Sequence, residues 1–271
     1  MRLTRLILAI LPLVACTTTG CAAFAKRPPS PATLVLAAEL ERTTPTPPGE
    51  RYFALVYGSQ STPKVPKYTH TWATVVRTSA ATETSPGTIL EHHTISWMPA
   101  TLDIQTKRFA IEPGVNLGLV ESLDVMFGFG ERVSVWGPYE IRAGLYQKGV
   151  IQKTFMESGQ MGYQCIDTIG EAASTGLGCN CVHALSDADA RAGRAQYPLT
   201  KYGESASERI VGQLHLADVV QNPGATHDWI LQDLGINHYP IVRRTYTTRP
   251  LEELIERIYS RIVVQAARVN E

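Results

Sequence analysis

The sequence predicts an α+β fold, because segments with strand character fill its first half and segments with helical character dominate the second. Three runs rich in β-branched and aromatic residues, at residues 52–57, 69–78 and 88–97, are typical of strands. From residue 141 the apolar residues recur with the spacing of a helix face. No repeat of solenoid length interrupts this order.

The strand segments are expected to form an antiparallel sheet. Residues 69–78 and 88–97 are separated by a turn, so we expect them to pair as a hairpin. Residues 119–127 predict a short helix closed by Gly128. A further short strand is predicted at residues 133–136, and Gly137 with Pro138 should end it.

The second half of the chain predicts several helices. Apolar residues at one helical face predict a helix over residues 141–157, with Gly159 beyond its end. Asn180 is a good N-cap, so a helix is expected to begin at Cys181. Further helical segments are predicted at three places: residues 205–216, residues 226–234, and an amphipathic stripe that begins at Pro250.

Composition limits the classes of function. The chain has 271 residues, 44% of them hydrophobic, which is enough for a globular core of one large domain or two small ones. Lys plus Arg equals Asp plus Glu at 25 each, and no basic cluster occurs, so we expect no nucleic-acid partner. No apolar run is long enough for a membrane-spanning helix. No phosphate-binding or dinucleotide-binding glycine motif is present, and no cofactor is expected.

The N-terminus has the pattern of a secretory signal. Arg2 and Arg5 precede a short apolar stretch that ends in Leu13-Val14-Ala15-Cys16. This ending resembles a lipobox, which implies cleavage before Cys16 and lipidation of that cysteine. Cys21 is the alternative lipid site, and an ordinary signal peptide cut near Ala22 is the other alternative. The resemblance implies a membrane anchor in a bacterial envelope, on the periplasmic side of the outer membrane where one exists.

Four segments follow from these patterns. We expect a signal peptide at residues 1–15, a Pro- and Thr-rich tether at residues 16–49, a folded domain at residues 50–245 and a C-terminal amphipathic helix at residues 246–271. An oxidising envelope permits disulfides. One possible pairing, Cys165 with Cys179, would leave Cys181 as a free thiol, although spacing alone does not decide connectivity.

Cys181 is the candidate nucleophile. A cysteine at a helix N-terminus meets the positive end of the helix dipole, which favours the thiolate. His183 is close in sequence, but residues two apart on a helix point about 200° apart, so we do not expect it to be the base. His70 and His93 lie on the two strands of the predicted hairpin, where one could act as base and the other could orient it. Strand alternation favours His93 over His92 for the interior face.

The combination of these motifs resembles the circularly permuted branch of the NlpC-type papain-like cysteine peptidases, to which lecithin–retinol acyltransferase-like enzymes belong. The matching segments, which span about 115 residues, are His70-Thr71-Trp72, His93 with Trp97, and Asn180-Cys181-Val182-His183. The resemblance implies an antiparallel sheet carrying the histidines, packed on a helix carrying the cysteine. It also implies that Cys181 is the nucleophile, His70 its base and His93 the residue that orients this base.

Three hypotheses about function follow. The first is an envelope hydrolase that cleaves an amide bond, in cell-wall peptide, through a thioester on Cys181. The second is a non-catalytic structural or ligand-binding lipoprotein of the same fold. The third is a lipid acyltransferase or esterase; Val182 stands where acyltransferase relatives carry Glu, and the tail after residue 185 does not match theirs. A metal site at Cys179, Cys181 and His183 is disfavoured because the two cysteines are too closely spaced.

Overall fold

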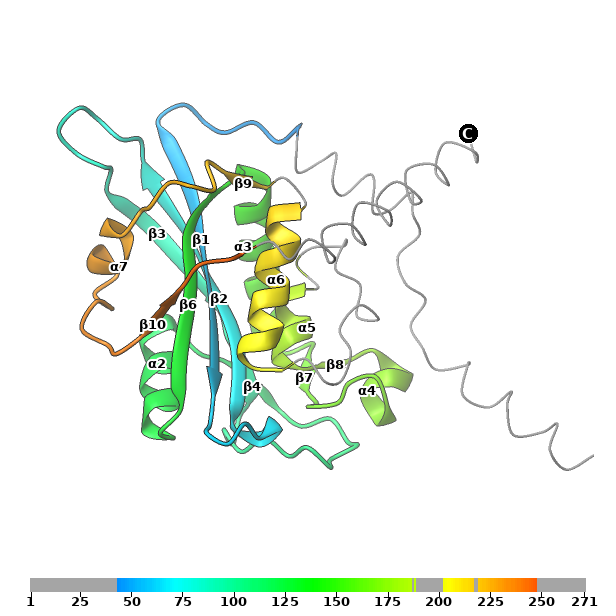
Figure 1. Cartoon of the computed structure of the whole chain (residues 1–271). Coiled ribbons are helices and arrows are strands. Elements are labelled where there is room, and N and C mark those ends of the chain that lie inside the picture. The colour runs from blue at the N-terminus through cyan, green and yellow to red at the C-terminus, as the bar shows by residue number, and fades with distance from the viewer. Residues whose placement is uncertain (1–42, 187, 189–201, 217–218, 248–271) are drawn as a thin grey trace, which may run out of the picture.

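The computed structural model describes residues 43–186, 188, 202–216 and 219–247. The chain forms an α+β fold around one mostly antiparallel sheet with the strand order β10-β6-β1-β2-β3, and β9 also pairs with β6 (Figure 1). Its strands are β1 (Glu50–Gln60), β2 (Thr69–Ser79), β3 (Ile89–Ile95), β6 (Arg132–Ile141), β9 (Val220–Gln221) and β10 (Val242–Arg244). Two small sheets pair β4 (Trp97–Pro99) with β5 (Gly114–Asn116), and β7 (Gly162–Tyr163) with β8 (Gly178–Cys179).

Helices cover both faces of the large sheet. They are the 3₁₀ helix η1 (Pro66–Tyr68) and the α-helices α2 (Leu119–Gly128), α3 (Ala143–Glu157), α4 (Gly170–Thr175), α5 (Cys181–Ser186), α6 (Glu204–Leu216) and α7 (Trp229–Asp233). In Figure 1, α3, α5 and α6 lie on one side of the sheet, and α2 and α7 lie on the other. The result is a three-layer arrangement with the core on both sides of β1 and β2.

A few close contacts show which strand residues face the α3 and α6 layer and which face the α2 layer. A Cβ on Gly58 would lie 2.6 Å from Ser207 Oγ of α6, and one on Gly149 of α3 would lie 3.1 Å from Val75. On the opposite face, Ser59 Oγ lies 3.1 Å from the sulfur of Met126 on α2. Because side chains alternate along a strand, the face of α3 and α6 also carries Thr71, whereas the face of α2 carries His70.

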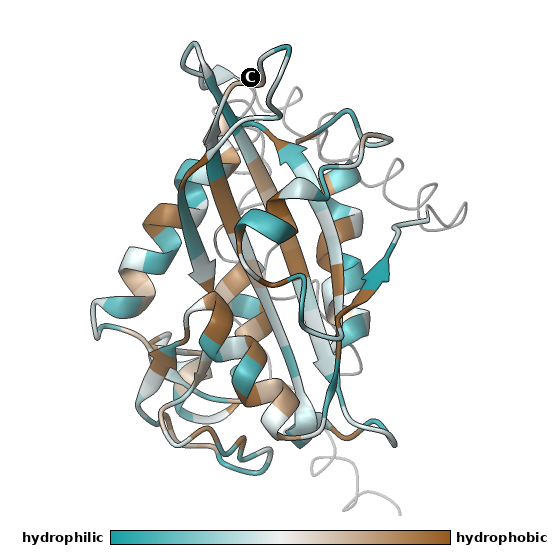
Figure 2. Ribbon diagram, turned by 90° about the vertical axis from the view of Figure 1, so that its left-hand side faces the viewer, coloured by the Kyte–Doolittle hydropathy of each residue, from teal (hydrophilic) through white to brown (hydrophobic). Residues whose placement is uncertain are grey.

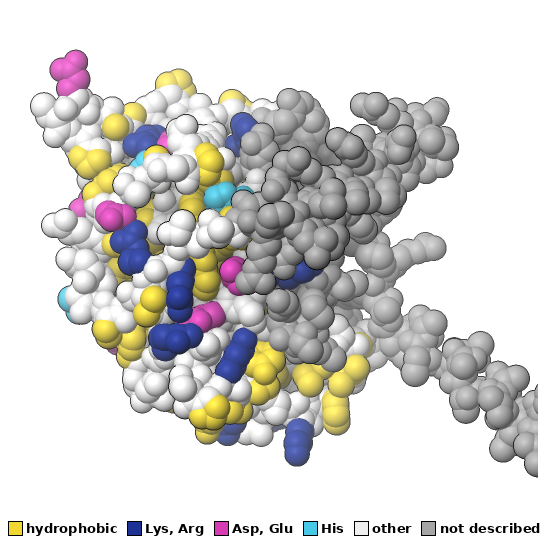
Figure 3. All heavy atoms as spheres, viewed as in Figure 1, with side chains coloured by type: hydrophobic (Ala, Val, Ile, Leu, Met, Phe, Trp, Pro, Cys, Tyr) yellow, Lys and Arg dark blue, Asp and Glu magenta, His cyan; other side chains and the backbone are white. Residues whose placement is uncertain are grey.

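Apolar side chains along the central strands form the core, and polar side chains lie at the surface. Hydrophobic residues run along the central strands between the helix layers, as Figure 2 shows. Phe53, Leu55 and Tyr57 are fully buried on one face of β1, and Ala54 and Val56 are buried on the other, so both faces of β1 contribute to the core. Figure 3 shows acidic and basic side chains interspersed on one face of the molecule. Among the described residues, no helix has both the length and the hydropathy needed to cross a membrane.

Most predicted elements are confirmed. The hairpin is present, because β2 pairs with β3 antiparallel and places Ala73 opposite Ile95. One prediction is wrong: Gly137 and Pro138 do not end the strand that begins at Arg132, which continues to Ile141. A register shift opposite residues 54–56 of β1 accommodates this segment within the sheet. The expected lipid sites Cys16 and Cys21 and the helix expected from Pro250 lie outside the described residues.

Candidate functional site

Cys181 is the first residue of α5, on the face of the sheet that also carries α3 and α6. Asn180 begins this helix as expected, since its Oδ1 accepts the backbone N–H of His183 at 2.9 Å. The backbone N–H of Thr71 on β2 donates a hydrogen bond to the Cys181 sulfur. The residue that β2 presents to the candidate nucleophile is therefore Thr71.

A buried hydrogen-bonded pair, Asp167 and His183, holds the start of α5 in place. The His183 Nδ1–H donates to the Asp167 carboxylate, with distances of 2.7 and 2.6 Å to its two oxygens. Asp167 also accepts the Asn180 backbone N–H at 3.1 Å and the Asn180 Nδ2–H at 3.2 Å. Since the Asp167 and His183 side chains are almost completely inaccessible, this cluster ties the segment after β7 to the helix that carries Cys181.

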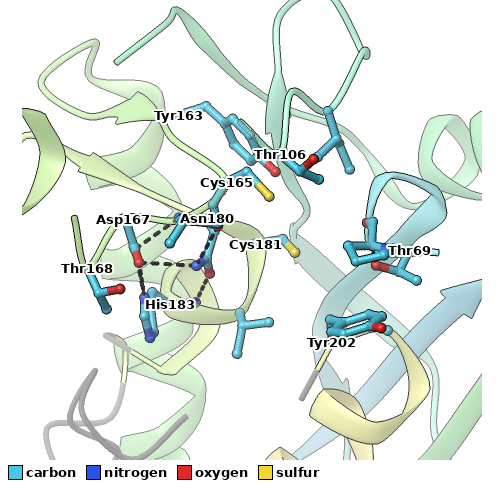
Figure 4. Close-up of a pocket in the computed structure, with 15 residues that line it drawn as sticks. Thr69, Thr106, Tyr163, Cys165, Asp167, Thr168, Asn180, Cys181, His183 and Tyr202 are labelled. Atoms are coloured by element: carbon cyan, nitrogen blue, oxygen red, sulfur yellow. Dashed lines mark hydrogen bonds and ion pairs between the residues drawn. The ribbon is translucent and has the colours of Figure 1, made fainter. Parts of the chain in front are cut away.

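A cavity of about 180 Å³ opens beside Cys181. Its wall is mostly apolar, hydroxyl-bearing or thiol-bearing, and includes Cys165, Tyr163 and Tyr202. Figure 4 shows the sulfurs of Cys165 and Cys181 pointing into this space, whereas the His183 imidazole points away from it. The Tyr163 hydroxyl donates a hydrogen bond to the Cys165 sulfur.

His70 does not face Cys181. Its side chain is on the opposite face of β2 from Thr71, beneath α2, where its Nε2 lies 2.8 Å from Ser96 Oγ. Ser96 Oγ in turn lies 2.7 Å from Ser122 Oγ of α2. Complete burial lowers the pKa of His70 to about 3, which keeps the imidazole neutral. The prediction that His70 is the base for Cys181 therefore conflicts with the geometry, because alternation places the two groups on different sides of the sheet.

His93 does not orient His70 either. It lies opposite Val75, five residues along β2 from His70, so the two imidazoles point to opposite faces of the sheet. The His93 Nε2 lies 3.8 Å from a carboxylate oxygen of Glu91, and its ring centroid lies 6.0 Å from that of Tyr146 on α3. The sequence correctly predicted that both histidines lie on one hairpin. Because side chains alternate along each strand, however, the two imidazoles lie on opposite faces of the sheet.

The thiol of Cys181 is not activated in this arrangement. Burial, the largest cause, raises the pKa of Cys181 to about 12, although the backbone N–H groups of Thr71 and Val182 act in the opposite direction. The expected lowering of the pKa by the helix dipole is outweighed, because α5 has only 6 residues and most of the Cys181 side chain is removed from water.

Alkylation of Cys181 is therefore expected to be slow at neutral pH. Burial also raises the pKa of Cys165 to about 11, so the rate of iodoacetamide modification at both sites should rise about tenfold per pH unit between pH 7 and 9. Site-resolved mass spectrometry measures this rate. Urea-unfolded protein is the control, in which the rate should level off near pH 8.5, the ordinary range of a thiol. A plateau below pH 8 in the folded protein would contradict the buried-thiol geometry.

The third cysteine of this region is a core residue. Cys179 is fully buried, and within the described part of the chain Cys165, Cys179 and Cys181 carry no disulfide bond. The suggested Cys165–Cys179 pairing is thus absent from the structure. The described residues also contain no group of three or more His, Cys, Asp or Glu side chains arranged to hold a metal ion.

Asp167 and Ser96 were missed by sequence reasoning, and Cys165 was considered only as a disulfide partner. Asp167 and Cys165 precede Asn180 by more than ten residues, and only the pairing of β7 with β8 brings them to α5. A signal was nevertheless present, because Cys165 and Asp167 have the same spacing as Cys181 and His183. Ser96, the partner of His70, follows the strand that carries His93 and had no distinguishing pattern.

Comparisons with known proteins give this chain no relative. No protein-family model, no curated protein and no solved structure matches it.

Proposed function

We propose that the chain is an envelope-anchored binding protein of permuted papain-like fold, whose cavity beside Cys181 receives the end of a cell-wall peptide. The observation that carries this proposal is the separation of Cys181 from His70 by the thickness of the sheet. A cysteine hydrolase needs a base within hydrogen-bond reach of its nucleophile. Neither His70 nor His93 is placed to act on Cys181, which favours binding over turnover.

The size and lining of the cavity favour a small, uncharged group as its ligand. Drug-sized pockets have volumes of roughly 300–1,000 Å³, and a cavity of about 180 Å³ is better suited to one end of an extended molecule. Asp167 and His183 in its wall are hydrogen-bonded to each other. Tyr163 and Tyr202 offer aromatic surface with hydroxyl groups, a combination suited to peptide groups. The lipobox-like sequence at Cys16 would hold such a protein close to the wall.

Co-sedimentation with purified peptidoglycan tests the proposal. The wild-type chain is expected to bind, and Tyr202→Ala should weaken binding by roughly tenfold or more, as removal of an aromatic anchor does. Phe129→Ala, at an exposed aromatic residue distant from the cavity lining, is the matched control and should bind like the wild type. Equal binding by all three proteins, or no binding at all, would contradict the proposal.

A second candidate, a cysteine amidase, is favoured by one observation. The backbone N–H groups of Thr71, Cys181 and Val182 all donate toward the Cys181 sulfur, an arrangement that stabilises negative charge there. Chromatography of the peptidoglycan after incubation separates the two candidates. Soluble peptide fragments released by the wild type, but not by Cys181→Ser, would establish the amidase and overturn the binding-only function.

A further inference from the structure

Cys165 and Cys181 each follow one of two paired strands by two residues. The parallel pair β7–β8 places Gly162 opposite Gly178 and Tyr163 opposite Cys179. Two residues beyond the last pair of this register, Cys165 and Cys181 both line the same cavity. Hydrogen bonds keep the segments together over this interval: Gln164 N–H donates to Cys179 O at 3.2 Å, and Asn180 Nδ2–H donates to Cys165 O at 3.2 Å.

This arrangement suits a disulfide. Paired strands lie about 4.8 Å apart, and disulfides join residues whose Cα atoms are separated by about 4.4–6.8 Å. Both sulfurs point into the same cavity in Figure 4, and both side chains are only half-buried. Cys165 also contributes to the raised pKa of Cys181. Cys179 alternates to the other side and is fully buried in the core.

We propose that Cys165 and Cys181 form a reversible disulfide across the mouth of the cavity when the protein meets a small-molecule disulfide. One cysteine thiolate attacks a sulfur of the oxidant, which forms a mixed disulfide and releases one small thiol. The second cysteine gives its proton to solvent and attacks the protein sulfur of that mixed disulfide, which releases the second small thiol. The two protein thiols lose two electrons, and the oxidant is reduced to two thiols.

The consequence is a cavity with two chemical states. In the reduced state both sulfurs line the space beside Tyr163, and in the oxidised state the Cys181 sulfur is bonded and is no longer a thiol. This inference does not depend on the proposed function, because it concerns only the two cysteines and the paired strands that precede them. Binding to peptidoglycan can therefore fail while the disulfide forms, or the reverse.

Peptide mapping after equilibration with oxidised glutathione tests the proposal on the full chain. Cleavage after Glu171 separates Cys165 from Cys181 unless a disulfide joins the two peptides. The joined peptides are expected in the oxidised wild type and should separate after treatment with dithiothreitol. Because Cys179 and Cys181 stay on one peptide, Cys179→Ala is the matched control and should keep the link, whereas Cys165→Ser and Cys181→Ser should lose it.

A second measurement uses only the wild type, so it does not depend on whether the variants fold. The masses of the peptides from the oxidised wild type should show that Cys165 and Cys181 carry no glutathione, since an internal disulfide only removes hydrogen. The reduced wild type should also bind phenylarsine oxide, which bridges two adjacent thiols, at these two cysteines. The proposal is overturned if a link to Cys165 persists in Cys181→Ser, if glutathione remains on either cysteine of the wild type, or if no link forms.

Discussion

Replacing Asp167 with alanine is expected to lower the free energy of unfolding by about 3 kcal/mol, because several buried hydrogen-bond donors lose their acceptor. The Asp167 carboxylate accepts hydrogen bonds from the His183 ring and from both the backbone and the side chain of Asn180. Its loss would leave these donors without an acceptor in a region closed to water. Denaturation in urea, followed by circular dichroism, measures the change.

An exposed ion pair provides the control for this variant. Lys67 Nζ lies 2.6 Å from Asp103 Oδ1, and both side chains are more than 40% exposed. Asp103→Ala is therefore expected to cost about 1 kcal/mol or less. If the two substitutions cost the same, Asp167 does not hold the start of α5, and the geometry described for Cys181 is incorrect. Alkylation of Cys181 should also accelerate in Asp167→Ala, because the helix is released from its anchor.

Acid is expected to destabilise the fold through His70. Burial lowers the pKa of His70 from 6.5 to about 3, so the folded state favours the neutral ring. The unfolded chain takes up a proton near pH 6.5, and the folded chain does so only near pH 3. The stability that the neutral ring contributes is therefore fully present above pH 6.5 and is lost as the pH falls toward 3. The loss is on the order of 4 kcal/mol.

The difference between wild type and His70→Gln isolates this contribution. Carboxylates titrate in the same range in both proteins, so the stability difference between the two should shift by several kcal/mol in favour of the variant from pH 7 to pH 3.5. Ser122→Ala is the matched control, because it removes a neighbour in the same hydrogen-bonded chain and leaves the imidazole in place. Its difference from the wild type should be the same at both pH values. A pH-independent difference for His70→Gln would show that His70 is not buried as a neutral ring.

Local patterns were sufficient for most of the secondary structure. The β-branched residues of β2 and β3 predicted the hairpin, and Asn180 predicted the first residue of α5, because capping and alternation depend only on neighbouring residues. The extension of β6 beyond Pro138 was not predicted, since a proline in a strand is tolerated only where its neighbours in the sheet accommodate it.

The position of Cys181 could be predicted from the sequence, but the residues that surround it could not. Asn180 marked Cys181 as the start of a helix. The sequence did not reveal that α5 would pack on the Thr71 face of β2 and not on the His70 face. The sequence of a strand does not say which of its two faces a helix will cover, so it does not say whether a histidine on that strand will face the helix. Asp167 and Cys165 joined the site only through the pairing of β7 with β8.

The sequence by itself determined the α+β class, the position of Cys181 at a helix start and the absence of excess charge. Those properties depend on short-range periodicity, capping and composition. Only the tertiary structure decided which side chains meet. It paired His183 with Asp167, enclosed His70 beside Ser96 and brought Cys165 and Cys181 to one cavity. The physical reason is that each strand offers two faces at equal local energy, and the burial of apolar surface between layers selects one.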